Sequence, residues 1–220
     1  MADQRKEILR RKYDALASRY ATHRYADPAA IARRQVELVR RWGTPAPPGA
    51  SVLEIGCADG FVTEALARAG YRVTAVDLSP AMVAAARQRL TEAGLDAEIL
   101  EADLDGLSLG RRFDVVLAVM ANFFHYATDP EATLARLRSH TAGKLIVDAD
   151  PRRVRPREAA RALAAAGLVR IAWRPFLVPQ TRTLARPALR ALAAAELVPG
   201  LRTVALRLTP KFVVKGEVPA

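Results

Sequence analysis

The chain has 220 residues, of which 34 are basic and 23 are acidic, so its formal net charge is +11 at pH 7. This length suits one sizeable α/β domain and is short for two. The charged start MADQRKEILRRKY lacks the apolar region of a signal peptide, and no stretch is apolar enough to span a membrane. A single cysteine, Cys57, excludes an internal disulfide and a cysteine-rich zinc site. These features predict a soluble, cytoplasmic protein without a transmembrane segment.

The excess of basic residues allows two interpretations. It favours an anionic partner, such as nucleic acid, a membrane surface or an acidic substrate. It also follows from a composition rich in arginine and alanine, in which case it carries no functional meaning. Net charge alone does not choose between them.

The predicted elements begin with two helices, at 3–24 and 28–42. Asp27 is the expected N-cap of the second helix, with Pro28 at its first position. The segment GTPAPPGA then marks the boundary of the main domain, because three prolines and two glycines interrupt the helical pattern.

Strands and helices alternate from residue 51 onward. The predicted strands are 51–55, 71–76, 97–100, 113–120, 144–149 and 168–173, and the predicted helices are 61–69, 80–93, 129–140 and 156–166. This rhythm predicts a parallel sheet with helices on both faces. The tail departs from it, with an irregular loop at 174–182, a helix at 187–198, and a strand pair or one long strand around Pro210.

The first strand leads into a turn bracketed by glycines, in the segment VLEIGCADG. Gly56 and Gly60 flank Ala58, which fits neither the dinucleotide pattern G-x-G-x-x-G nor a Walker loop. Glu54, at the end of the strand, would repel a diphosphate but suits a ligand that carries an ammonium group. The turn therefore predicts a cationic or zwitterionic ligand.

Two further acids follow the second and third strands. Asp77, in VTAVDLSPAM, is placed to accept hydrogen bonds from ribose hydroxyls, and Asp103, in EADLDGL, lies at the level of an adenine amine. Together with Glu54 they describe an adenosine ligand with a positive end and no phosphate. Each also has a local interpretation, Asp77 as a helix cap and Asp103 as a solvated loop acid.

Here the sequence resembles the class I S-adenosylmethionine-dependent methyltransferases of the small-molecule type. The resemblance covers roughly residues 50–150 and rests on VLEIGCADG, VDLSPAM, EADL and FDVVLAVMANFFHY, with Ala58 departing from the family's middle glycine. It implies that S-adenosylmethionine is the cofactor. The residues that it implies for the cofactor are Glu54, Gly56 and Gly60 at the methionine part, Asp77 with Leu78 at the ribose, Asp103 with Leu104 at the adenine, and Met82 packed on the nucleoside.

The predicted fold class is α/β, a Rossmann-like, doubly wound, mostly parallel seven-stranded sheet with helices on both faces and an N-terminal helical extension. We expect one domain over 1–220, divided into a helical cap (1–44), a cofactor-binding core (45–150) and a C-terminal substrate-side region (151–220). In similar small-molecule enzymes a helix like YDALASRY folds over the cofactor, so Tyr20 is predicted to close the pocket. Aromatic packing of an added helix is the alternative.

The segment MANFFHYATDP, after the fourth strand, is where the catalytic groups are expected. It lacks the N/D-P-P-Y/F signature of nucleobase amine methylation, and Cys57 lies within the cofactor turn. His125 is the favoured general base, with Tyr126 or Asn122 orienting the acceptor; a packed core histidine is the alternative. His140 is expected to carry a favourable charge at a helix end. Asp148 and Asp150 share a strand face without a visible third ligand, so no metal is predicted.

The predicted function is methyl transfer from S-adenosylmethionine to a small-molecule acceptor, with O-methylation favoured and an apolar or anionic metabolite as acceptor. Trp173 and Phe176, beside Arg174, Arg182 and Arg186, would shape its pocket, or else belong to a plain packed subdomain. The alternatives are an RNA or protein methyltransferase and a non-catalytic cofactor-binding subunit. A nucleic-acid partner is disfavoured but open, and the oligomeric state is not predicted.

Overall fold

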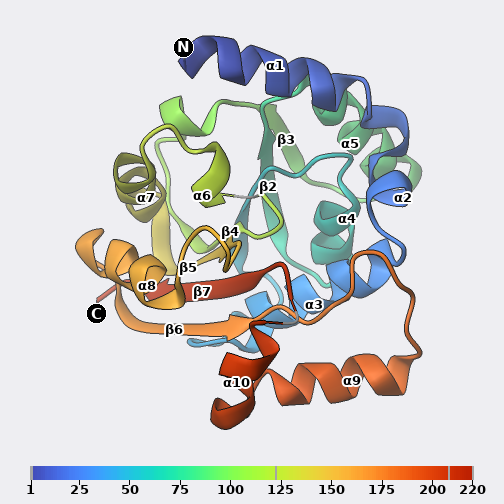
Figure 1. The fold of residues 1–220 in the computed structure, drawn as a ribbon. Coiled ribbons are helices and arrows are strands. Elements are labelled where there is room, and N and C mark those ends of the chain that lie inside the picture. The colour runs from blue at the N-terminus through green and yellow to red at the C-terminus, as the bar shows by residue number, and fades with distance from the viewer. Residues whose placement is uncertain (1, 122, 208, 220) are drawn as a thin grey trace.

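The structure is a computed structural model that describes residues 2–121, 123–207 and 209–219. Within these residues, seven strands form one sheet in the order β3-β2-β1-β4-β5-β7-β6 (Figure 1). The strands are β1 (Ser51–Ile55), β2 (Arg72–Asp77), β3 (Glu98–Glu101), β4 (Phe113–Ala118), β5 (Thr141–Ala149), β6 (Val169–Pro175) and β7 (Phe212–Glu217). β7 runs antiparallel to β5 and β6, and the other pairs are parallel. The predicted fold class is confirmed.

Helices cover both faces of the sheet. On one face, an apolar cluster joins the sheet to three helices, α3 (Pro28–Arg41), α4 (Phe61–Arg68) and α5 (Pro80–Glu92). On the other, a second cluster joins it to α6 (Phe123–Tyr126), α7 (Pro130–Ser139) and α8 (Pro156–Ala165). The strands between them read as continuous apolar runs because both of their faces are buried.

Three helices begin with the same local device. Asp27, Ser79 and Asp129 are the N-caps of α3, α5 and α7, and each side chain accepts a hydrogen bond from a backbone N–H in the first turn. A proline follows each cap, where its fixed φ suits the helix and its missing N–H is not needed. The cap predicted at Asp27 is confirmed.

The N-terminal extension is not the single helix expected over 3–24. It consists of α1 (Ala2–Asp14), a 3₁₀ turn (Ala17–Arg19) and α2 (Tyr20–Arg24), and α1 crosses the carboxyl ends of the strands (Figure 1). The helix breaks because its end is fastened to α5, where the Asp14 carboxylate accepts hydrogen bonds from Ser79 Oγ at 2.5 Å and the Ala81 N–H at 3.4 Å. These tertiary contacts override local helix propensity.

The C-terminal prediction is partly wrong. The helix expected at 187–198 is present as α9 (Arg186–Ala195), but the strand pair or long strand around Pro210 is not. The segment expected to be strand begins inside another helix, α10 (Pro199–Ala205). Only Phe212–Glu217 enters the sheet, as β7. The alternating pattern of RTVALRL is typical of a strand, but Pro199 at the first helical position starts a helix instead.

None of the helices in the described part of the chain is long and apolar enough to cross a membrane. The division of the chain into a cap, a core and a substrate-side region stays a prediction.

Candidate cofactor site

A pocket of about 140 Å³ lies at the carboxyl ends of the parallel strands. This is the edge at which open α/β sheets bind their ligands. Its lining comes from the turns after β1, β2, β3 and β4 and from the N-terminal extension, and includes Gly56, Asp77, Leu78, Asp103, Leu104, Met120 and Tyr20. The structure thus brings together six of the nine residues predicted for the cofactor.

The turn after β1 contains three left-handed positions at alternate residues. The φ angles of Gly56, Ala58 and Gly60 are 72°, 48° and 79°. Alanine adopts this conformation at a cost of roughly 1 kcal/mol. The Ala58 N–H donates a hydrogen bond of 2.9 Å to Asp77 Oδ2, which helps to hold the alanine there. The turn therefore keeps the geometry of a glycine at its middle position.

Asp77 joins the first two turns of the pocket. One of its carboxylate oxygens accepts from Ala58, and the other accepts from the Ser79 N–H at 2.9 Å. Burial raises the pKa of Asp77, and these backbone donors oppose that rise. Each carboxylate oxygen carries further lone pairs, so the group retains acceptor capacity toward the pocket.

Asp103 lies beneath α1 and is paired with it. Lys6 Nζ on α1 lies 2.6 Å from Asp103 Oδ2 and 2.7 Å from Asp105 Oδ2. The same lysine side chain, with Leu9 and Tyr13, forms part of the pocket lining. Sequence reasoning missed Lys6 and Asp105, because their role depends on how α1 crosses the sheet.

Three predicted residues, Glu54, Gly60 and Met82, do not line the pocket but support its turn from behind. Glu54 is buried in β1 and accepts a 2.7 Å hydrogen bond from Thr63 Oγ1. Burial, with the charges of Asp77 and Asp59 nearby, raises the pKa of Glu54 to about 8. Gly60 packs against Ala86 of α5, and Met82 is buried beneath Ala58.

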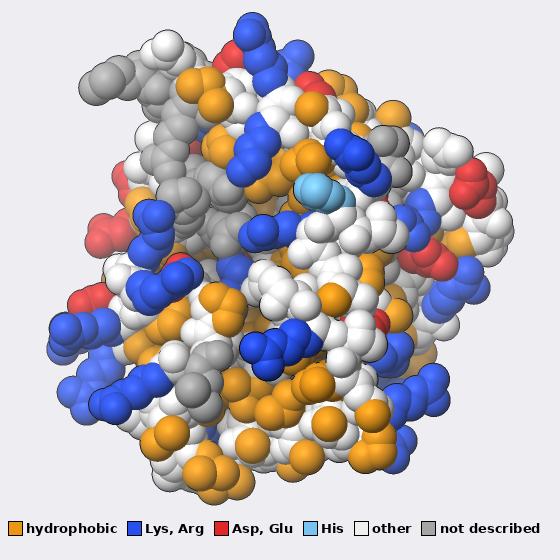
Figure 2. Space-filling model, turned by 45° about the vertical axis from the view of Figure 1, so that its right-hand side comes forward, with side chains coloured by type: hydrophobic (Ala, Val, Ile, Leu, Met, Phe, Trp, Pro, Cys, Tyr) orange, Lys and Arg blue, Asp and Glu red, His pale blue; other side chains and the backbone are white. Residues whose placement is uncertain are grey.

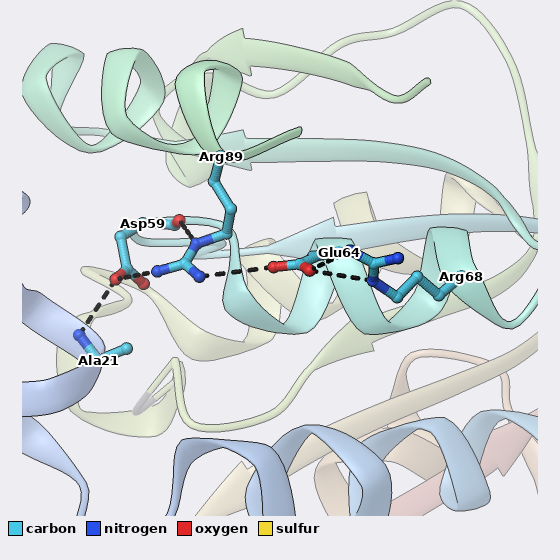
Figure 3. A network of polar contacts seen from close by, with 5 residues as sticks. All are labelled: Ala21, Asp59, Glu64, Arg68 and Arg89. Carbon is cyan, nitrogen blue, oxygen red and sulfur yellow. Dashed lines mark hydrogen bonds and ion pairs between the residues drawn. The ribbon is translucent and has the colours of Figure 1, made fainter. Parts of the chain in front are cut away.

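Asp59, which sequence reasoning also missed, ties the glycine turn to the N-terminal extension (Figure 3). Its Oδ2 accepts from the Ala21 N–H at 3.2 Å and from Arg89 at 3.1 Å. Arg89 also donates to the Asp59 carbonyl and reaches Glu64 on α4. Through this network the turn, α2, α4 and α5 are held as one unit.

Aromatic rings close the pocket from the side of the N-terminal extension. The Tyr20 ring lies in edge contact with Tyr13 at 5.9 Å and with Tyr25 at 6.1 Å between centroids. Burial raises the pKa of Tyr20 above its ordinary value, so its phenol stays neutral at physiological pH. The sequence predicts Tyr20 either to close the pocket or to pack an added helix by its ring. It contacts two other aromatic rings and also lines the pocket.

The expected catalytic segment follows β4 as predicted. Met120 takes a left-handed φ of 67° at the pocket, a strained conformation of the kind that gathers at functional sites. Phe123, which opens α6, and Ala127 line the pocket. His125 and Tyr126 belong to α6 by their backbone, but their side chains lie outside the described part, as does the whole of Asn122.

Three other residues that the sequence singles out, His140, Trp173 and Phe176, do not line the cofactor pocket. His140 ends α7 as predicted but is buried, where its Nε2 accepts a hydrogen bond from the Leu109 N–H at 3.0 Å and its Nδ1 lies 2.9 Å from the Arg136 carbonyl oxygen. Trp173 packs on Phe212 on one face of the sheet, and Phe176 is buried in the cluster on the other. The structure therefore does not bring these two aromatics together in one acceptor pocket.

The two acids at the end of β5, Asp148 within the strand and Asp150 just after it, have separate partners. Asp148 is buried in an ion pair with Lys211, while Asp150 pairs with Arg152 at 2.7 Å. Each carboxylate thus has a structural role in balancing a neighbouring cation.

Comparison with known proteins finds a methyltransferase domain in the part of the chain that carries most of the pocket lining. Residues 52–143 match the family described as a methyltransferase domain. A ubiquinone biosynthesis O-methyltransferase of Xanthomonas axonopodis pv. citri is 32% identical over 105 residues, which is 46% of this chain and 43% of that protein. A cypemycin N-terminal methyltransferase of a Streptomyces species is 40% identical over 91 residues, covering 41% of this chain and 36% of that protein. The match thus spans less than half of either relative.

Solved structures share the fold over most of the chain. The magnesium protoporphyrin IX methyltransferase of Synechocystis PCC 6803, with bound SAM, aligns with a TM-score of 0.62 at 21% identity, covering 87% of this chain and 81% of that one. The [4+2]-cyclase SpnF aligns with a TM-score of 0.68 at 18% identity, covering 96% and 95%. At such identities the likeness concerns the fold alone.

Residues 52–143 include the glycine turn, Asp77 and Asp103. The sequence predicts these residues to bind the cofactor. Residues 52–143 thus match a methyltransferase domain, and one of the solved structures that share the fold contains bound SAM.

Proposed function

We propose that this protein transfers the methyl group of S-adenosylmethionine to a small-molecule acceptor, with O-methylation as the favoured reaction. The observation that carries the proposal is the pocket at the strand ends, in which Asp77 and Asp103 lie among apolar side chains within the methyltransferase domain. Carboxylates suit ribose hydroxyls and an adenine amine, and Leu78, Leu104 and Met120 suit the flat face of a base. These acceptors and apolar side chains therefore fit this cofactor.

The roles of the residues follow from their places. Asp77 would accept hydrogen bonds from ribose hydroxyls. Asp103 would accept a hydrogen bond from the adenine amine while its carboxylate also binds Lys6. Tyr20 and Tyr13 would keep water out of the pocket. Glu54, Gly60 and Met82 would act by holding the turn, since they do not line the pocket.

The bound cofactor would supply an electrophilic methyl group on a sulfonium sulfur. An acceptor oxygen would form a bond to the methyl carbon as the carbon–sulfur bond breaks, with that electron pair remaining on sulfur. His125 would take the acceptor proton, and Tyr126 would orient the acceptor. This assignment rests on the position of α6, directly after β4 and between two residues that line the pocket.

Support for a small acceptor and for oxygen comes from the relative named as a ubiquinone biosynthesis O-methyltransferase. The relative named as a cypemycin N-terminal methyltransferase supports the alternative of a peptide amine, and the net charge of +11 supports RNA. The cytoplasmic location stays part of the proposal.

The test is transfer of isotopically labelled methyl from S-adenosylmethionine to a panel of phenols, carboxylic acids and primary amines, with short peptides and RNA as separate arms. Mass spectrometry of the products identifies the labelled atom. The proposal expects a labelled phenol or acid, and loss of that product in H125A with reduced yield in Y126F. Labelled RNA or peptide only would replace the small-molecule acceptor, while binding of the cofactor without any transfer would favour a non-catalytic subunit.

A further inference from the structure

A second cavity, of about 660 Å³, opens between α3 and α9. It shares no lining residue with the cofactor pocket. Its size falls in the range of small-molecule sites, roughly 300–1,000 Å³. We refer to it as the α3–α9 groove.

The α3–α9 groove is strongly basic. Against one glutamate, Glu37, its lining includes six arginines, namely Arg33, Arg34, Arg41, Arg174, Arg186 and Arg190. Arg186 and Arg190 lie four residues apart on α9 and so share one face of that helix. Apolar side chains, among them Trp42 and Leu189, complete the lining.

Arg174 is the buried arginine of this groove that forms no ion pair with a described residue. It is only 8% exposed, and its guanidinium lies 4.2 Å from the centre of the Trp42 ring. Among the residues that the structure describes, no carboxylate or carbonyl accepts a hydrogen bond from it. Burial and the neighbouring Arg34 lower the pKa of Arg174 to about 10, although the charge of Glu196 opposes this change, and the guanidinium stays charged at neutral pH.

The nearby acids are already committed to other donors. Glu196 accepts from Arg34 with one carboxylate oxygen and from the Leu177 N–H, at 2.9 Å, with the other. Glu37 pairs with Arg34 at 2.9 Å. A buried cation without a paired anion is destabilising, and such a charge is normally balanced by a carboxylate, a phosphate or a similar group. The groove therefore offers a cation that forms no ion pair with a described carboxylate, because Glu196, whose charge raises the pKa of Arg174, is already bonded to Arg34 and Leu177.

Side-chain chemistry defines what would fit. A guanidinium presents a planar fork of N–H donors that matches carboxylate and phosphate oxygens in pairs, and stacking on an aromatic ring fixes its plane. The exposed surface around α9 is also apolar and basic. Figure 2 shows hydrophobic side chains at the height of α9 and α10, bordered by Lys and Arg, with few acidic groups.

We propose that the α3–α9 groove is a second binding site, which holds the phosphate or carboxylate group of a small organic anion with Arg174 as its anchor. The arginines of α9 and α3 complete the charge around that group, and Trp42 with Leu189 contacts its apolar part. The site is independent of the cofactor pocket and of the acceptor assigned above.

The test is calorimetric titration of the full chain with two probes, inorganic pyrophosphate and citrate, at matched ionic strength. We expect saturable binding of at least one probe and a loss of affinity of tenfold or more in R174Q. Stronger binding of pyrophosphate assigns the site to phosphates, and stronger binding of citrate assigns it to carboxylates.

Two further variants make the result decisive. R152Q removes an arginine that is 76% exposed outside the groove, so it should bind both probes like the original protein. R190Q changes an exposed groove residue without disturbing the core and should lower affinity severalfold, which keeps the test valid if R174Q does not fold. Absence of saturable binding, or equal losses in R152Q and R190Q, would overturn the proposal.

Discussion

Lys6 Nζ lies 2.6 Å from Asp103 Oδ2, although the two residues are 97 positions apart in the sequence. This ion pair fastens α1 across the pocket, whose volume of about 140 Å³ is below the usual range for small-molecule sites. We therefore expect α1 to move outward when S-adenosylmethionine binds, and the Lys6 pair to oppose that movement.

Replacing Lys6 by methionine removes the ammonium group and keeps an apolar side chain of similar length. We expect K6M to bind and to release S-adenosylmethionine faster, severalfold in each direction, because the closed position of α1 is less favoured. Stopped-flow fluorescence measures both rates. R11M is the matched control on the same helix, since among the described residues Arg11 pairs with Glu7 of α1, at the exposed surface. Equal rate changes in the two variants would contradict the role of the Lys6 pair.

Gly60 illustrates a position where both backbone and packing require glycine. Its φ is +79°, and a Cβ placed there would lie 2.9 Å from the Cβ of Ala86. We expect G60A to lower the free energy of unfolding by about 2 to 4 kcal/mol, combining left-handed strain with overpacking. G94A is the control, because Gly94 has a φ of +62° with open space around it and should lose only about 1 kcal/mol. Urea unfolding compares the two, and a similar loss in both would show that the contact with α5 is unimportant.

Glu54 should make stability depend on pH. Its pKa is raised from 4.5 to about 8 by burial, so between these values the folded protein keeps a proton that the unfolded chain has lost. The free energy of unfolding contributed by Glu54 is then highest below pH 4.5 and falls as pH rises toward 8, by at most about 1.4 kcal/mol per pH unit.

The E54Q variant tests this dependence, because glutamine does not titrate and can still accept the hydrogen bond from Thr63. Urea unfolding at several pH values between 5 and 8 should show a flatter profile for E54Q than for the original protein. Parallel profiles for the two proteins would mean that Glu54 is ionised in the folded state.

The elements between residues 51 and 150 could be predicted because their information is local. Ser79 and Asp129 cap helices through neighbours within three residues, and the strands are recognised as apolar runs. The resemblance to a family added the ligand to this pattern, and Asp77, Asp103 and Gly56 all lie at the pocket.

The remaining features depend on contacts between distant segments. Asp14 ends α1 by bonding to Ser79, and Lys6 reaches the pocket only because α1 crosses the sheet. The RTVALRL segment alternates like a strand. The position between β5 and β6 in the sheet, however, is occupied by residues 212–217. No local pattern brings Arg174 of β6 against Trp42 at the end of α3.

The most direct measurement is calorimetric titration of the purified protein with S-adenosylmethionine and S-adenosylhomocysteine, alongside D77A and D96A. We predict saturable binding of one ligand per chain, weakened at least tenfold in D77A and unchanged in D96A, whose original side chain is exposed. Thermal unfolding of each variant establishes that it is folded. No saturable binding of either compound to the original protein would contradict the account.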